Sequence, residues 1–349
     1  MSYQPQRLVL LFDGTWNDPQ HNTNVIKLAR SIAPFAGPQR QRFFYSPGVG
    51  TTGATRLMGG LFGVGLSKNL LQGYDWLARH YRPGDEVWVF GFSRGAYTAR
   101  SMVGMIRKCG LLHIVTPIQL AEAERLYRNK SAAPDGEQCQ QFRRQYSQEI
   151  KIHLLGVWDT VGALGIPGTL LSERGTYAWH DTRLSKIVER AYQAIALDEH
   201  RAVYNTVPWT SPNGQKKPAQ KIVEQRWFIG AHANVGGGYI NDPLADLALA
   251  WMQQKASAAG LVLDAIQPAE NPWITAPTDS YHQFLAGFYR HYRRWFHQGD
   301  GRFYRSLYTG EAGERSVGVT IDDAVWLRWQ HVPSYRPYTL IQAGLEPPP

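Results

Sequence analysis

Cysteine is almost absent from this sequence, which has only Cys109 and Cys139 among its 349 residues. Two cysteines cannot build a disulfide framework, and no combination of cysteine and histidine has the spacing of a zinc site. We therefore expect a chain that is made in a reducing compartment and that needs neither a metal nor a cofactor.

Long hydrophobic runs are also absent. No stretch approaches the roughly 18 consecutive apolar residues that a membrane-spanning helix needs. The first apolar run, at residues 8–12, is too short for the core of a signal peptide. We expect a protein that is cytoplasmic when made, so any later export would have to use a route without a cleaved signal.

The composition favours a folded chain with a basic surface. Hydrophobic residues make up 43% of the sequence, enough for a sizeable core, and the formal net charge is +9. An excess of positive charge is common on protein surfaces, but it also attracts anionic surfaces such as phospholipid headgroups. Because no nucleic-acid-binding motif is present, we expect no nucleic-acid partner.

Apolar strand patterns alternate with helical patterns along the chain. Strands are predicted at residues 8–12, 43–45, 86–90, 151–158 and 225–230, and helices at 24–32, 67–81, 96–108, 184–197 and 244–258. This alternation predicts an α/β fold with a mainly parallel sheet and helices on both faces. The glycine-rich stretch 48–65 is predicted to be a mobile loop. Residues 113–150 are predicted to form a helical insertion, and residues 270–320 an aromatic and basic C-terminal appendage.

Ser93 lies at the centre of the most informative motif, Gly91-Phe92-Ser93-Arg94-Gly95. This is the G-x-S-x-G pattern of the nucleophile elbow in α/β-hydrolases, in which a tight strand-to-helix turn raises the serine above the sheet. A predicted strand precedes the motif and a predicted helix follows it, as such a turn requires. The alternative is a glycine-rich turn with no catalytic role.

A nucleophilic serine needs a general base, and the base needs an acid that orients it. In α/β-hydrolases the acid and then the histidine follow the serine along the chain. Asp159 follows the next predicted strand, and His232 follows the one after that. Asp159 could instead cap a turn, and His232 could be a packed histidine, in which case His331 is the best reserve base.

The oxyanion of an acyl-transfer reaction needs two hydrogen-bond donors. The backbone N–H of Arg94, directly after the nucleophile, should supply one of them. The loop after the first strand should supply the other, through Gly14 or Thr15, while the Asp13 side chain holds the turn. An ordinary Asp-Gly turn explains the same residues equally well.

Four stretches, in this order along the chain, resemble one family, the type VI secretion phospholipase effectors of the first lipase-effector group and their uncharacterised relatives. They are residues 12–17 (FDGTWN), 91–100 (GFSRGAYTAR), 156–162 (GVWDTVG) and 227–239, which includes His232. The resemblance, which spans about residues 8–260, implies an α/β-hydrolase fold, a triad of Ser93, Asp159 and His232, and hydrolysis of phospholipid acyl esters. We expect the whole chain, residues 1–349, to form a single domain of this fold. It also implies delivery into a rival bacterium, with a secretion-apparatus protein and an immunity protein as partners.

The sequence departs from this family at two positions. Asn234 stands where family members usually carry an aspartate, and the stretch around Asp322 replaces a histidine-proline-serine stretch. If either position helps to orient the base or the substrate, activity would be altered. These departures leave open a catalytically impaired binding module. Two further alternatives are a soluble carboxylesterase and a metal-dependent phosphohydrolase that uses Asp13, Asp159 and His232.

Aromatic residues and arginines alternate between residues 279 and 308. Such a segment is typical of a lid that makes peripheral contact with a membrane. It is also typical of a packed helical appendage with a solvated basic face. The sequence alone favours the appendage slightly.

Overall fold

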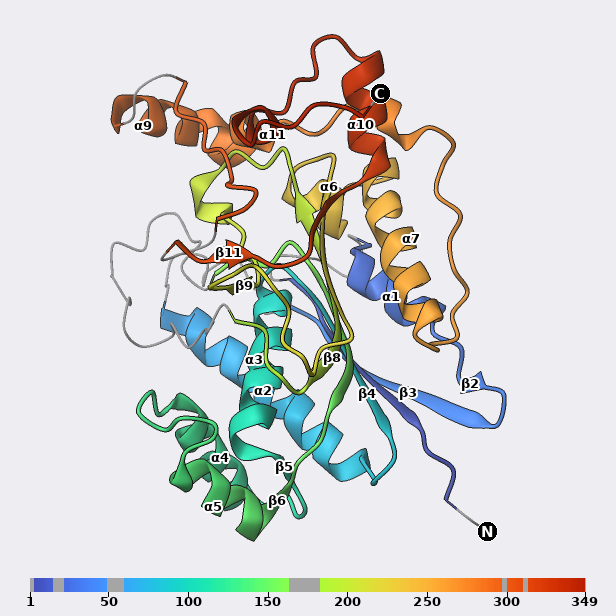
Figure 1. Ribbon diagram of the computed structural model, residues 1–349, viewed down its shortest axis with the longest axis vertical. Helices are drawn as coiled ribbons and strands as arrows, with labels where there is room; N and C mark the ends of the chain where they lie inside the picture. Colours follow the sequence, from blue (N-terminus) through green and yellow to red (C-terminus); the bar gives the residue numbers. More distant parts are fainter. Residues whose placement is uncertain are drawn as a thin grey trace.

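One eight-stranded sheet forms the centre of the computed structural model, which describes residues 3–14, 22–48, 60–162, 183–296, 300–309 and 313–348 (Figure 1). From one edge to the other, the strands are β12 (Val319–Ile321), β10 (Ile222–Phe228), β8 (Val188–Ala196), β7 (Ile152–Trp158), β4 (Glu86–Phe92), β1 (Arg7–Phe12), β3 (Gln39–Ser46) and β2 (Phe35–Ala36). All neighbours pair in parallel except the short edge strand β2, which is antiparallel to β3.

Strand β1 shows why the sequence forms such a sheet. Its residues 8–12 are all apolar and buried, because both faces of a parallel sheet are covered. Successive side chains point to opposite faces. Leu8 and Leu10 belong to the hydrophobic core on one face, and Val9 and Leu11 belong to the core on the other.

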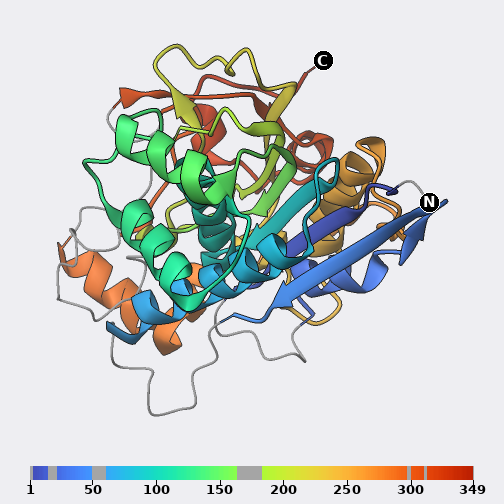
Figure 2. The same ribbon diagram turned by 90° about the horizontal axis from the view of Figure 1, so that it is seen from below.

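Helices cover both faces of the sheet (Figure 1; Figure 2). One face carries α2 (Gly60–His80) and α3 (Arg94–Cys109), and the other carries α1 (Asn24–Ser31) and α7 (Pro243–Ala258). Helices α4 (Pro117–Arg128) and α5 (Glu137–Tyr146) contact α3, in the region where a helical insertion is predicted. This arrangement confirms the predicted fold class, a mainly parallel α/β-hydrolase-like sheet with helices on both faces.

Short elements connect and extend this framework. Two small antiparallel ladders pair β5 (Leu111–Leu112) with β6 (Ser147–Gln148) and β9 (Thr210–Ser211) with β11 (Arg315–Ser316). The other helices of the described residues are α6 (His232–Gly236), α8 (Ser280–Gln283), α9 (Phe288–Phe296), α10 (Asp323–His331), α11 (Tyr338–Gln342) and the 3₁₀ turns η2 (Ala202–Tyr204), η3 (Pro272–Ile274) and η4 (Phe284–Gly287).

Two local predictions are wrong. The sequence predicts a helix over residues 184–197, but Val188–Ala196 is strand β8, hydrogen-bonded between β7 and β10. Alanine, glutamate, arginine and glutamine give this segment a helical preference, which pairing and burial on both sides override. The predicted loop 48–65 is also too long, because α2 begins at Gly60; residues 49–59 lie outside the described part of the chain.

The strands end together at one edge of the sheet. In the register, Phe92 at the end of β4 lies opposite Trp158 at the end of β7. Ala196 at the end of β8 lies opposite Phe228 at the end of β10. Residues that follow these strands are therefore brought together above the same edge.

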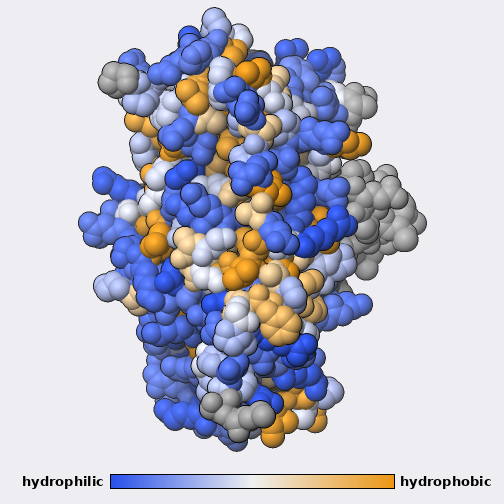
Figure 3. Space-filling model, turned by 90° about the vertical axis from the view of Figure 1, so that its right-hand side faces the viewer, coloured by the Kyte–Doolittle hydropathy of each residue, from blue (hydrophilic) through white to orange (hydrophobic). Residues whose placement is uncertain are grey.

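The surface that carries α1 and α7 shows hydrophobic residues in small groups among hydrophilic ones (Figure 3). Such scattered apolar residues are normal for a folded domain. Among the described helices, none is both long enough and apolar enough to span a bilayer.

Candidate active site

Ser93 occupies the turn between β4 and α3 and has an unusual backbone conformation. Its φ is 58° and its ψ is −121°. A residue with a side chain seldom adopts positive φ, and such strain is typical of functional turns. The backbone N–H of Ser93 donates to the carbonyl of Trp158, 3.0 Å away, which fixes the turn to the end of the neighbouring strand.

The glycines on either side of Ser93 are required by close packing. A Cβ atom at Gly91 would lie 2.5 Å from the carbonyl oxygen of Gly95. A Cβ atom at Gly95 would lie 2.1 Å from the carbonyl oxygen of Phe12 at the end of β1. The sharp strand-to-helix turn therefore depends on both glycines of the motif, as the elbow geometry predicts.

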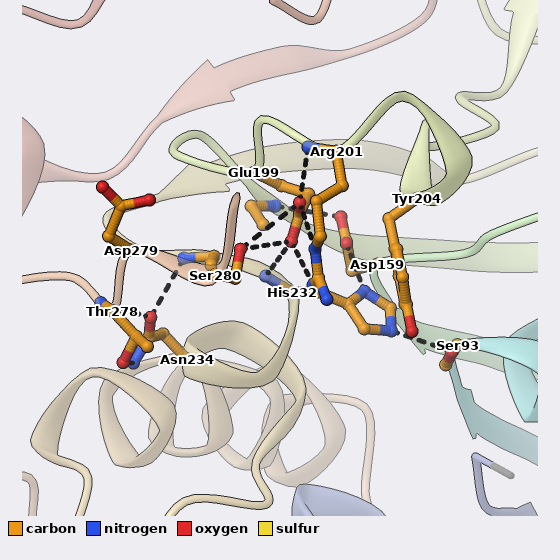
Figure 4. Close-up of polar contacts among 12 residues, drawn as sticks. Ser93, Asp159, Glu199, Arg201, Tyr204, His232, Asn234, Thr278, Asp279 and Ser280 are labelled. Atoms are coloured by element: carbon orange, nitrogen blue, oxygen red, sulfur yellow. Dashed lines mark hydrogen bonds and ion pairs between the residues drawn. The ribbon is translucent and has the colours of Figure 1, made fainter. Parts of the chain in front are cut away.

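Ser93, His232 and Asp159 form a continuous hydrogen-bonded chain (Figure 4). The hydroxyl Oγ of Ser93 lies 2.8 Å from Nε2 of His232. Nδ1 of His232 lies 2.6 Å from Oδ2 of Asp159. The three side chains come from the ends of β4 and β7 and from the start of α6, which follows β10, so three distant parts of the sequence meet at one edge of the sheet.

The carboxylate of Asp159 is held from several sides. Its Oδ1 accepts hydrogen bonds from the backbone N–H of Ala196 at 3.0 Å and from Nη1 of Arg305 at 2.6 Å. Nη2 of Arg305 lies 3.0 Å from Oδ2. Burial alone would raise the pKa of Asp159, but the charge of Arg305 and the hydrogen bond from His232 outweigh it and lower the pKa to about 2.

His232 is buried, and two aromatic rings flank its imidazole. The ring centroid of Phe92 lies 4.7 Å away, and that of Tyr204 lies 5.0 Å away. Burial lowers the pKa of His232 below its ordinary value, and the hydrogen bond to Asp159 opposes this shift without cancelling it. The imidazole is therefore neutral near pH 7, which is the form that can accept a proton.

A second buried ion pair lies beside the triad. Nε and Nη2 of Arg201 donate to the two oxygens of Glu199 at 2.8 and 2.6 Å. Glu199 also accepts hydrogen bonds from the backbone N–H of His232 and the hydroxyl of Ser280. The Arg201 guanidinium lies 3.8 Å from the centroid of the Tyr204 ring (Figure 4). This pair fixes the start of α6 and the aromatic wall beside His232.

The predicted oxyanion donors lie in different situations. Arg94 directly follows Ser93 and is the first residue of α3, so its backbone N–H lies at the helix N-terminus beside the nucleophile. The N–H of Gly14 donates to Oδ1 of Asp13 at 2.7 Å, so in this structure it stabilises the turn to which it belongs. Asp13 also accepts from Thr23 and Tyr45 and ties β1 to its neighbours. Thr15 lies outside the described residues.

Asn234 and Asp322, the two departures from the family pattern, contact other parts of the chain. The Asn234 side chain accepts from the backbone N–H groups of Ala231 and Thr278 and donates to Asp242 at 2.8 Å. Asp322 caps α10 and pairs with Arg226. Neither side chain replaces a partner of Ser93, Asp159 or His232.

Four other histidines in the described part of the chain have partners away from Ser93. His331, the reserve base, bonds to the carbonyl of Leu327 on its own helix and packs against Trp273. Three others have partners outside the site, namely His153 with Ala259, His200 with Phe303 and His282 with Asp279. Of the histidines named here, His232 is the one whose imidazole contacts Ser93 Oγ.

Sequence reasoning missed Glu199, Arg201, Tyr204 and Arg305. The charged run 198–201 directly follows the apolar end of β8, which would have marked it as a strand-end site if the strand had been identified. Arg305 had no such signal, because it is one of several arginines in the aromatic and basic segment.

The sheet, the strained serine turn and the hydrogen-bonded Ser-His-Asp chain define an α/β-hydrolase-like protein with a triad arrangement. Residues 6–255 match the family described as "T6SS, Phospholipase effector Tle1-like, catalytic domain". The chain belongs to this family, which confirms the resemblance seen in the four sequence stretches.

Three other proteins show more distant similarity. An uncharacterized protein of Saccharomyces cerevisiae is 29% identical over 231 residues, which cover 59% of this chain and 33% of the yeast protein. An uncharacterized protein from Pseudomonas aeruginosa, known from a crystal structure, is 17% identical in sequence. The two structures match with a TM-score of 0.41, and the match covers 76% of this chain and 48% of that one.

The structure of the Tle1 effector bound to the VgrG spike of the type VI secretion system is 18% identical with a TM-score of 0.43, and the similarity covers 69% of this chain and 52% of that one. The chain thus spans between a third and about half of the length of these relatives.

Proposed function

We propose that this protein is a serine hydrolase that cleaves acyl esters of phospholipids through Ser93, His232 and Asp159. The hydrogen-bonded chain from Ser93 Oγ to His232 Nε2 and from His232 Nδ1 to Asp159 Oδ2 carries the proposal. Membership of a phospholipase effector family supports the choice of substrate.

In the first half of the reaction, Ser93 Oγ attacks the ester carbonyl carbon while His232 Nε2 accepts the hydroxyl proton. Asp159 holds the imidazole and stabilises its positive charge. The N–H of Arg94 stabilises the oxyanion, and one such donor contributes about 3 kcal/mol in the transition state. When the intermediate collapses, the C–O bond to the alcohol breaks, His232 returns the proton to the leaving oxygen, and an acyl-serine remains.

In the second half, water takes the place of the alcohol. His232 removes a proton from the water, whose oxygen attacks the acyl carbon. The bond to Ser93 Oγ then breaks, the serine recovers its proton from His232, and a fatty acid leaves. The neutral state of the buried imidazole suits both of its base steps.

The substrate would be presented at a lipid surface. Helix α9 carries Trp295, which is 86% exposed, next to the exposed Arg294. An aromatic ring and a basic side chain at one helix end are suited to an anionic headgroup layer. Peripheral membrane contact is part of the proposal, as are export through the type VI apparatus and an immunity partner.

Turnover of phospholipid vesicles and of short-chain p-nitrophenyl esters, with Ser93→Ala as the matched control, tests the proposal. We expect release of fatty acid from vesicles by the native protein and none by Ser93→Ala. Activity on short esters alone would favour the soluble carboxylesterase. No activity on either substrate would favour a binding module, and Ser93→Ala activity equal to the native level would overturn the serine mechanism.

The structure gives less support to the metal-dependent phosphohydrolase. The oxygens of Asp159 face His232 and Arg305, and those of Asp13 face Gly14, Thr23 and Tyr45. Activity that a chelator abolishes, and that persists in Ser93→Ala, would favour this alternative.

A further inference from the structure

We propose that Arg305 is a positioning residue of the triad, so that the chain beyond the matched catalytic domain completes the active site. The inference rests on the proposed serine mechanism and adds to it. The family match ends at residue 255, and Arg305 lies on the segment between α9 and β11.

The guanidinium of Arg305 forms a bidentate ion pair with the carboxylate of Asp159. Nη1 lies 2.6 Å from Oδ1 and Nη2 lies 3.0 Å from Oδ2, and both side chains are essentially inaccessible to solvent. A bidentate pair of this kind fixes the plane of the carboxylate as well as its distance. Because Oδ2 also accepts the hydrogen bond from Nδ1–H of His232, that plane sets the direction in which the imidazole points.

The same guanidinium also holds the wall beside the base. It donates to the carbonyl of Ala196 at the end of β8 and to the carbonyl of Tyr204 in η2. The Tyr204 ring packs against His232 and beneath Arg201. Arg305 therefore contacts the acid directly and reaches the base through Tyr204.

The position of Arg305 is itself fixed from the C-terminal part of the chain. Its carbonyl accepts a hydrogen bond from the hydroxyl of Thr339 on α11 at 3.0 Å. Leu307, two residues further on, lies in the hydrophobic cluster formed by α10, α11 and the ends of β8 and β10. The geometry of the triad thus depends on a segment packed outside the matched domain.

Charge gives Arg305 a second effect. Asp159 is fully buried, and burial favours the neutral acid. The adjacent guanidinium keeps the carboxylate ionised, so it can stabilise the imidazolium that forms when Ser93 is deprotonated. Without Arg305, Asp159 would take up a proton at higher pH and stop supporting the base.

Arg328 provides a matched control. Its guanidinium is also buried, but it donates to the carbonyls of Trp273, Ile274 and Thr275 and touches no member of the triad. Arg305→Met and Arg328→Met each remove a buried guanidinium from the C-terminal part of the chain. Only the first should change the chemistry of the site.

The experiment measures hydrolysis of a short-chain p-nitrophenyl ester, and the rate at which a fluorophosphonate labels Ser93, across a pH series for the native protein and both variants. For Arg305→Met we expect kcat to fall about 100-fold near pH 7, with KM unchanged. The acid limb of the pH profile should move to higher pH. Arg328→Met should lose thermal stability and keep the native kcat and acid limb per folded molecule.

Arg305→Lys separates charge from geometry and covers the case in which Arg305→Met does not fold. Lysine keeps the positive charge but cannot form the planar two-nitrogen contact. We expect kcat to fall about tenfold, with the acid limb near its native position.

Native kcat and a native acid limb in Arg305→Met would overturn the role of Arg305. If only Arg305→Lys folds, the same result in that variant would overturn it. So would equal changes in Arg328→Met. Neither result bears on Ser93, whereas activity retained in Ser93→Ala would overturn the serine mechanism itself, so the two failures can be told apart.

Discussion

Replacing Asp159 by asparagine should lower both the catalytic rate and the stability of the folded protein. The change removes one charge and keeps the size of the side chain, so the backbone need not move. In a Ser-His-Asp triad, an amide in place of the acid favours the wrong imidazole tautomer and lowers kcat by about 10⁴-fold. The Arg305 guanidinium, 2.6 Å from Oδ1, would then lie buried without its counter-charge.

The size of the stability effect follows from this burial. Breaking a buried ion pair by removing one partner typically costs about 3–5 kcal/mol. We expect the lower end for Asp159→Asn, near 3 kcal/mol, because the amide oxygen can still accept from Arg305. Part of the native stabilisation depends on pH, because the folded-state pKa of Asp159, about 2, lies below its ordinary value of 3.8.

A lowered folded-state pKa fixes the sign of this dependence. The contribution of Asp159 to stability, on the order of 2 kcal/mol, is fully present above pH 4 and is lost as the pH falls from about 4 to 2. This acid-dependent loss should be absent from Asp159→Asn. Urea unfolding of both proteins between pH 2 and pH 7 measures it.

A double variant completes the test. In the Asp159→Asn background, Arg305→Met removes a charge that has no partner. The free energy of unfolding lost through Arg305→Met should therefore be about 2 kcal/mol smaller in that background than in the native protein. Activity should stay at the Asp159→Asn level. Additive losses of stability in the double variant would refute the reasoning, and so would an Asp159→Asn protein with native kcat.

Three further predictions follow from the site. Because burial lowers the pKa of His232, kcat/KM should rise with pH along an acid limb whose midpoint lies below pH 6.5; a midpoint above pH 7 in initial-rate measurements would contradict this. Ser93→Gly and Ser93→Ala should both be inactive, but the free energy of unfolding of Ser93→Gly, measured with urea, should be higher by about 1 kcal/mol because glycine tolerates φ of 58°. Asn234→Asp should destabilise the protein by about 1–3 kcal/mol at pH 7 and by less at pH 4, because it replaces the amide that donates to Asp242 with a second carboxylate. Equal destabilisation at both pH values would be the contrary result.

Much of the fold could be predicted because its signals are local. The apolar runs of β1, β4 and β7 indicate a parallel sheet buried on both faces. The motif around Ser93 needs glycines where neighbouring backbone segments pack closely. Asp159 and His232 could be singled out because each follows an apolar strand and because they come after Ser93 in the order acid, then histidine. Their approach to Ser93 follows from the register of the parallel strands.

The rest depends on contacts that a single sequence does not reveal. Strand β8 carries residues that prefer helices, and its place between β7 and β10 overrides that preference. With β8 misassigned, the ion pair of Glu199 and Arg201 at its end could not be anticipated. Arg305 reaches Asp159 across 146 positions of sequence, and no local pattern distinguishes it from neighbouring arginines.

Mass spectrometry of the protein after reaction with a fluorophosphonate tests the central claim most directly. The account predicts a single covalent adduct on the peptide that contains Ser93, and no adduct in Ser93→Ala. Labelling of His232→Ala should be slower by several orders of magnitude, because the hydroxyl would lack its base. An adduct on another serine, or labelling that persists unchanged in Ser93→Ala, would contradict it.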